Sequence, residues 1–151
     1  MEEFDKETAA RVWQRVQSRR PMAEMTPEPT ARELVLQSHA LAGLYLGMHR
    51  MLGGRAGERL RELYRDQLRT KECLRGLCML EGEAPPLPPM ESGKGSARDR
   101  LRACVHREQR LGEALAGLAA EGEYAQVYGR LARQAGERCL RVLELLGASG
   151  G

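Results

Sequence analysis

Apolar residues recur every three to four positions through four long stretches of this 151-residue chain, and this spacing restricts its fold more than any other feature. On a helix of 3.6 residues per turn, residues with such spacing share one face. The apolar positions include Leu34, Leu41, Leu52, Leu60, Leu63, Leu74, Leu77, Leu101, Val105, Leu111, Leu115, Val127, Leu131, Val142 and Leu145. The stretches predict helices at about 31–52, 56–81, 97–120 and 124–146, and therefore an all-α fold.

Turn and loop signals separate these predicted helices. Thr30 is a predicted N-cap, with Glu33 completing a capping box, and Gly53-Gly54 ends the first helix. The segment 83–96 carries four prolines and two glycines, so it cannot be a helix. At about 3.1 Å per residue it can span roughly 40 Å, the height of a bundle. Short loop, long crossover and short loop predict a four-helix bundle with one long connection between its second and third helices. A P-x-x-P ligand for a partner domain is the alternative reading of the segment.

The two ends of the chain are predicted to lie outside the bundle. Ala9, Val12, Trp13 and Val16 recur at helical spacing before Pro21, which predicts a short N-terminal helix that packs Trp13 onto the main body. The length favours one domain. We expect an N-terminal helix and loop at 1–30, the bundle at 31–147 and a disordered tail at 148–151.

Composition disfavours several classes of protein. The 24 Lys and Arg residues nearly balance the 21 Asp and Glu residues and are interleaved with them, which disfavours binding to nucleic acid. No apolar run approaches the roughly 20 residues that a membrane span requires, and the acidic N-terminus is unlike a signal peptide. The four cysteines form no C-x-x-C pair, so we expect free thiols and a reducing cytoplasm.

Polar or small residues interrupt the apolar faces at one level of the predicted bundle. Glu108 lies in the stripe of the third helix, where a carboxylate must be neutralised by a metal ion, a cation or a proton. The other interruptions are Ser38 on the first helix, Gln67 and Thr70 on the second, and Ala135 and Arg138 on the fourth. Ferritin-like carboxylate proteins place one Glu on each of two helices and a Glu-x-x-His pair on each of the other two at such a level.

Several short segments follow the pattern of one protein family. They are Ala10 to Val16, Tyr64-Arg65-Asp66-Gln67, Cys73 to Leu77, Arg107-Glu108, Leu131 to Gln134 and Leu143 to Gly147. On these segments the chain resembles the small bacterial rubrerythrin-related, ferritin-like domain proteins, over residues from about 8 to 147. The resemblance implies a ferritin-like four-helix bundle and a site for two iron or manganese ions.

The ligand set that the resemblance implies is nearly lost. Ser38 replaces a Glu, Gln67 and Thr70 replace one Glu-x-x-His pair, and Ala135 and Arg138 replace the other, while Glu108 matches. Tyr45 keeps the aromatic residue expected on the first helix, whereas Leu115 replaces the one on the third.

One carboxylate cannot hold two divalent cations, and the Arg138 guanidinium cannot give up its charge. We predict a buried ion pair between Glu108 and Arg138, with Ser38, Gln67 and Thr70 satisfying the remaining donors and acceptors. His39, His49 and His106 turn away from this level and are expected at the surface or its boundary.

The leading functional hypothesis is a non-catalytic structural or protein-interaction module without metal or other cofactor, forming a homodimer or binding another protein. No Cys-His or Ser-His pair is placed for nucleophilic catalysis, and no glycine-rich loop is placed for phosphate. One alternative is an oxidoreductase or metal-storage protein with an atypical iron or manganese site around Glu108. Another is a small-ligand or anion binder at mid-bundle, where Ser38, Thr70 and Ala135 are smaller than the family's ligands.

Overall fold

Four long helices make up the part of the chain that the computed structural model describes, residues 29–150. They are α2 (Ala31–Met51), α3 (Gly54–Glu81), α4 (Ala97–Leu118) and α5 (Ala125–Gly150), and no strand occurs in this range. The predicted all-α fold is confirmed for these residues. The predicted N-terminal helix lies outside them.

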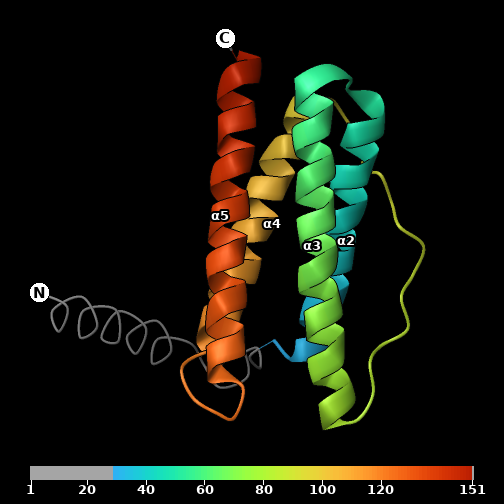
Figure 1. Cartoon of the computed structure of the whole chain (residues 1–151). Coiled ribbons are helices and arrows are strands. Elements are labelled where there is room, and N and C mark those ends of the chain that lie inside the picture. The colour runs from blue at the N-terminus through green and yellow to red at the C-terminus, as the bar shows by residue number, and fades with distance from the viewer. Residues whose placement is uncertain (1–28, 151) are drawn as a thin grey trace, which may run out of the picture.

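The helices form two hairpins that pack face to face. In Figure 1, α2 pairs with α3 and α4 pairs with α5, and the segment after α3 returns along the length of the bundle, so that α3 and α4 run in the same direction. Between the hairpins, α2 packs against α4 and α3 packs against α5. This arrangement brings the apolar faces of all four helices to one core, which includes Leu34, Leu41, Tyr45, Met48, Leu60, Leu63, Leu74, Leu111, Leu115, Leu131 and Val142.

Side-chain caps fix where two of the helices begin. The Thr30 hydroxyl accepts a hydrogen bond of 3.4 Å from the Glu33 amide, which is the N-cap half of the predicted capping box. A full capping box begins α4 instead, where Ser96 and Asp99 each accept from the other's backbone amide. Such caps satisfy amides that have no partner within the helix and typically contribute about 1 kcal/mol.

Two glycines on α2 allow the crossover segment to pack closely against this helix. A Cβ on Gly43 would lie 2.5 Å from the Glu91 carbonyl oxygen, and one on Gly47 would lie 2.6 Å from Ser92 Cβ. Gly43 and Gly47 are one turn apart, so they present a strip of bare backbone on one face of α2. The crossover chain therefore approaches α2 more closely than any larger residue at these positions would permit.

The last helix is longer than predicted. We expected it to end at 146, followed by a disordered tail at 148–151, but α5 continues to Gly150. Residues 147–150 contain no proline, and a helix that is already formed adds one hydrogen bond for each further residue. Weak helix formers at its end lower its stability without breaking it.

Candidate functional site

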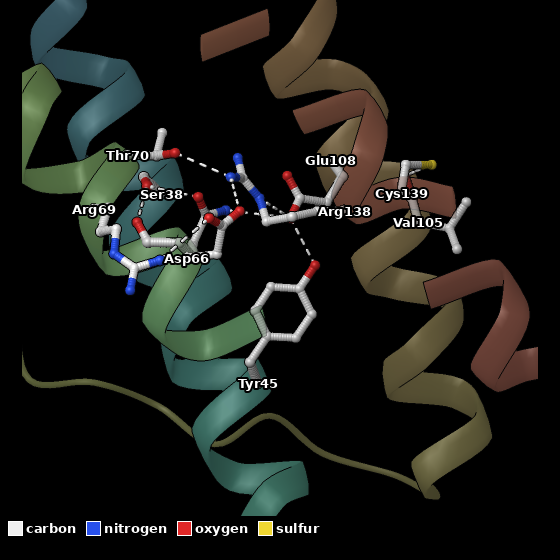
Figure 2. Close-up of polar contacts among 10 residues, drawn as sticks. Ser38, Tyr45, Asp66, Arg69, Thr70, Val105, Glu108, Arg138 and Cys139 are labelled. Atoms are coloured by element: carbon white, nitrogen blue, oxygen red, sulfur yellow. Dashed lines mark hydrogen bonds and ion pairs between the residues drawn. The ribbon is translucent and has the colours of Figure 1, made fainter. Parts of the chain in front are cut away.

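The six positions singled out in the sequence lie in the bundle core. Ser38, Gln67, Thr70, Ala135 and Arg138 have side chains with no solvent exposure, and Glu108 is 1% exposed. They come from all four helices, and Figure 2 shows Ser38, Thr70, Glu108 and Arg138 at one level of the bundle. The helical periodicity thus placed all of these positions on inward faces.

Arg138 lies at the centre of this level. Its Nε donates a hydrogen bond of 2.8 Å to Glu108 Oε2, and both side chains are fully buried, so the ion pair predicted from the sequence is present. The Arg138 Nη1 group donates to Asp66 Oδ2 at 2.9 Å and to Thr70 Oγ1 at 3.0 Å (Figure 2). A guanidinium with several fixed donors suits such a site, because it can bind acceptors on two helices at once.

Glu108 collects its hydrogen bonds on one oxygen. Tyr45 donates its hydroxyl proton to Glu108 Oε2 at 2.6 Å, and the Gln67 amide donates to the same oxygen at 3.4 Å. Ser38 donates to Gln67 Oε1 at 3.1 Å and so reaches the ion pair only through that side chain. Thr70 and Gln67 therefore form hydrogen bonds directly with the ion pair, as predicted, whereas Ser38 is linked to it only through its hydrogen bond to Gln67.

Ala135 has no polar role in the site. Its methyl group faces Gly112, where an added Cβ would lie 3.5 Å away, so α4 and α5 approach closely beside Glu108. Because α4 and α5 are close together here, the Arg138 side chain on α5 can contact Glu108 on α4.

Asp66 is the site residue that the sequence analysis missed. Its side chain, 24% exposed, accepts from Arg138 at 2.9 Å and contacts Arg69 at 3.8 Å. Asp66 precedes Thr70 by four residues, so both belong to one face of α3. The spacing of four residues from the inward-facing Thr70 could have indicated that Asp66 belongs to the site. Asp66 was missed because it lies beside the apolar stripe rather than within it.

Burial and charge act in opposite directions on Glu108. Burial raises the pKa of Glu108 above its ordinary value, although the charge of Arg138 and the hydrogen bond from Tyr45 lower it. Burial likewise lowers the pKa of Arg138, but Glu108 and Asp66 together raise it. Arg138 therefore stays charged, and Glu108 is the member of the pair that can take up a proton. Burial, and then the charge of Glu108, raise the pKa of Tyr45 well above its ordinary value, so Tyr45 keeps its hydroxyl proton.

The residues at this level do not fit a centre of two metal ions. The Arg138 guanidinium lies between the Glu108 and Asp66 carboxylates, where it would repel a cation. Thr70 and Gln67 offer neutral oxygens, which bind divalent transition metals more weakly than imidazoles and carboxylates do. Within residues 29–150, no group of three or more His, Cys, Asp or Glu side chains is arranged to hold a metal ion.

The three histidines lie away from the ion pair, but one expectation about them was wrong. His39 is only 7% exposed, because the crossover covers it and the Pro88 carbonyl oxygen lies 2.6 Å from its Nε2. The tautomer that donates to Pro88 leaves Nδ1 free to accept from Lys71 Nζ at 3.4 Å. His49 is half-buried and its Nδ1 lies 2.8 Å from the Gly57 carbonyl oxygen, while His106 is exposed, as expected.

The four cysteines, all within the described residues, are free thiols, as the sequence predicted. No helix among residues 29–150 has the length and apolar character to cross a membrane. Comparisons with models of protein families, with curated proteins and with solved structures find no match to this chain.

The Tyr45 hydroxyl gives a direct test of the geometry around Glu108. We expect Tyr45→Phe to lower the free energy of unfolding by about 1.5–3 kcal/mol, the usual contribution of a hydrogen bond to a charged group. Tyr64→Phe is the matched control, because Tyr64 is a half-buried tyrosine that packs against the core on α3. Urea denaturation of the three proteins measures the difference. A loss no greater in Tyr45→Phe than in the control would contradict the assigned hydrogen bond.

Proposed function

We propose that this chain is a ferritin-like four-helix bundle in which a fixed ion pair stands in place of the metal centre, and that it acts as a non-catalytic structural or protein-interaction module. The observation that carries the proposal is the position of Arg138, with its guanidinium bound to Glu108 and Asp66 where the family's metal ligands would converge. A permanent cation there is incompatible with the redox or storage chemistry of two bound metal ions.

The arrangement of the helices supports the ferritin-like part of this proposal. Two hairpins joined by one long crossover, with α3 and α4 running in the same direction, is the connectivity of ferritin-like folds (Figure 1). The six site positions, of which only Glu108 on α4 keeps the family's residue, also occur on the helices where the family's pattern requires ligands: one on α2, a pair spaced i, i+3 on α3, one on α4 and a second such pair on α5.

Metal analysis of the purified protein tests the proposal. We expect substoichiometric iron and manganese by elemental analysis, and a melting temperature that neither added metal nor a chelator changes. A bound metal ion whose free concentration is a hundred times its Kd would stabilise the fold by about 2.7 kcal/mol, which a melting curve detects readily. Two tightly bound ions per chain would refute the proposal and favour the oxidoreductase or metal-storage alternative around Glu108.

A variant with the family's ligands restored provides the positive control. It combines Ser38→Glu, Gln67→Glu, Thr70→His, Ala135→Glu and Arg138→His. Binding of manganese by this variant, and not by the natural chain, would locate the lost metal centre at this level.

We further propose that the module forms a homodimer or binds another protein in the cytoplasm. Leu140 and Leu143, one turn apart on α5, are 62% and 45% exposed and supply apolar area for such a contact. Sedimentation equilibrium of the natural chain tests self-association. A strictly monomeric protein would leave a different protein as the partner.

One observation favours a second candidate function, the binding of a small polar ligand at mid-bundle. Arg138 Nη2 and Glu108 Oε1 are buried without a hydrogen-bond partner among the described residues. A buried unpaired donor or acceptor costs about 1–3 kcal/mol, so a ligand that offered both an acceptor and a donor would be stabilised there. Acetate and acetamide are suitable probes, and a rise in the melting temperature that Arg138→Leu abolishes would support this candidate.

A further inference from the structure

An apolar patch lies at the end of α3. Met79 and Leu80, in the last turn of the helix, are 63% and 68% exposed, which are the largest values for large apolar side chains in the described part of the chain. Helical side chains lean over the preceding turn, which here holds Gly76. Gly76 has no side chain, and a Cβ built on it would meet nothing within 4 Å, so Gly76 contributes nothing that covers the patch.

The chain that precedes α2 enters the bundle beside this patch. Arg32, in the first turn of α2, forms an ion pair of 3.9 Å with Glu83, which follows α3 by two residues. The start of α2 and the end of α3 therefore lie together at one end of the bundle, as Figure 1 shows. Residues 17–28 lie between the N-terminal apolar stripe and this point, and at about 3.3 Å per residue they can span roughly 40 Å. The N-terminal segment is thus long enough to reach Met79 and Leu80.

The sequence of the N-terminal segment matches the patch in chemistry. It contains the only Phe and the only Trp of the chain, Phe4 and Trp13, and Trp13 lies in a stripe with Ala9, Val12 and Val16. A large aromatic side chain gains more from burial than any other residue type. Arg15 and Arg19, four residues apart, follow on one side of the same stripe in helical register. The exposed carboxylate of Glu81 lies next to the patch, so its charge is complementary to that of Arg15 and Arg19.

We propose that the N-terminal segment folds back on its own bundle and seats Trp13 on the patch formed by Met79 and Leu80. The contact removes three large apolar side chains from water, and the short tether raises the effective concentration of the segment at the patch. The segment therefore covers its own bundle in preference to a second copy of the chain. This inference does not depend on the proposed loss of the metal centre.

The single tryptophan makes the proposal directly testable in the full-length chain. We expect Trp13 fluorescence to be shifted to shorter wavelength than that of an exposed indole and to be protected from quenching by acrylamide. Met79→Gln/Leu80→Gln should move the emission to longer wavelength and increase the quenching constant several-fold. Both substitutions are on the surface, so far-UV circular dichroism and the unfolding midpoint should show that the bundle still folds.

A matched pair of surface leucines provides the control. Leu140→Gln/Leu143→Gln alters an exposed pair on α5 and should leave Trp13 fluorescence unchanged. The proposal is overturned if the Met79 and Leu80 variant leaves the emission unchanged, or if the Leu140 and Leu143 variant shifts it instead. A loss of protection on dilution of the natural protein would also overturn it, because the segment would then be covered by a second copy.

Discussion

Arg138→Leu lowers the free energy of unfolding by about 3–5 kcal/mol, the largest effect that we expect from any single substitution in this protein. Leucine fills much of the volume but leaves the Glu108 carboxylate, 1% exposed, without its cation. Asp66 contributes little to the loss, because its partly exposed side chain can turn to solvent. Urea or thermal denaturation of the purified variant measures the change.

Two further proteins isolate the ion pair as the cause. Arg133→Leu makes the same change at an exposed position on α5 and should alter stability by no more than about 0.5 kcal/mol. Glu108→Leu/Arg138→Leu removes both charges, and we expect it to recover much of the loss, because replacing a whole buried pair by apolar residues is often nearly neutral. Equal stability of Arg138→Leu and the double variant would contradict the assigned pairing.

The loss in Arg138→Leu should also depend on pH. Arg138 lowers the pKa of Glu108, so its removal raises that pKa further above the ordinary value. The folded variant then holds a proton that the unfolded chain releases. The stability from this proton is complete below the unfolded pKa and is lost as pH rises through the folded pKa. The penalty is therefore smaller at about pH 5 than at about pH 8, and Glu108→Leu/Arg138→Leu should lack this dependence.

Gly43→Ala/Gly47→Ala should lower the free energy of unfolding by about 2 kcal/mol, although alanine is the better helix former. Each new methyl group would press on backbone atoms of the crossover, at Glu91 and Ser92, and overpacking costs roughly 1–3 kcal/mol per site. The gain in helix propensity, about 1 kcal/mol per site, is smaller. Limited proteolysis should also cut the crossover faster, because the segment is lifted from α2.

Glycine-to-alanine substitution at helical positions with free space around them should instead stabilise the protein. Gly117 and Gly136 are helical, and a Cβ on either would meet nothing within 4 Å. Gly117→Ala/Gly136→Ala should therefore raise the free energy of unfolding by up to about 2 kcal/mol. If both double variants change stability in the same direction, the crossover is not held by the two glycines of α2.

Most of the fold followed from local signals in the sequence. Leucines at helical spacing predicted α2, α3, α4 and α5, and the prolines after α3 predicted the crossover. These signals are readable because amphipathic periodicity and proline geometry act within a few residues. The end of α5 was misjudged for the same reason, because no local signal stops a helix in residues 147–150.

Parts of the site followed from the sequence as well, since Glu108 and Arg138 stand out as charges on apolar stripes, and one cation and one anion in a common core must pair. The sequence alone thus determined the helices, the inward level of polar residues and the charges that must meet there. Only the tertiary structure decided that Asp66 shares Arg138, that Tyr45 donates to Glu108, and that the crossover covers His39 on α2. These contacts join residues far apart in the chain, and their partners depend on how helices are rotated and spaced, which no local pattern of residues encodes.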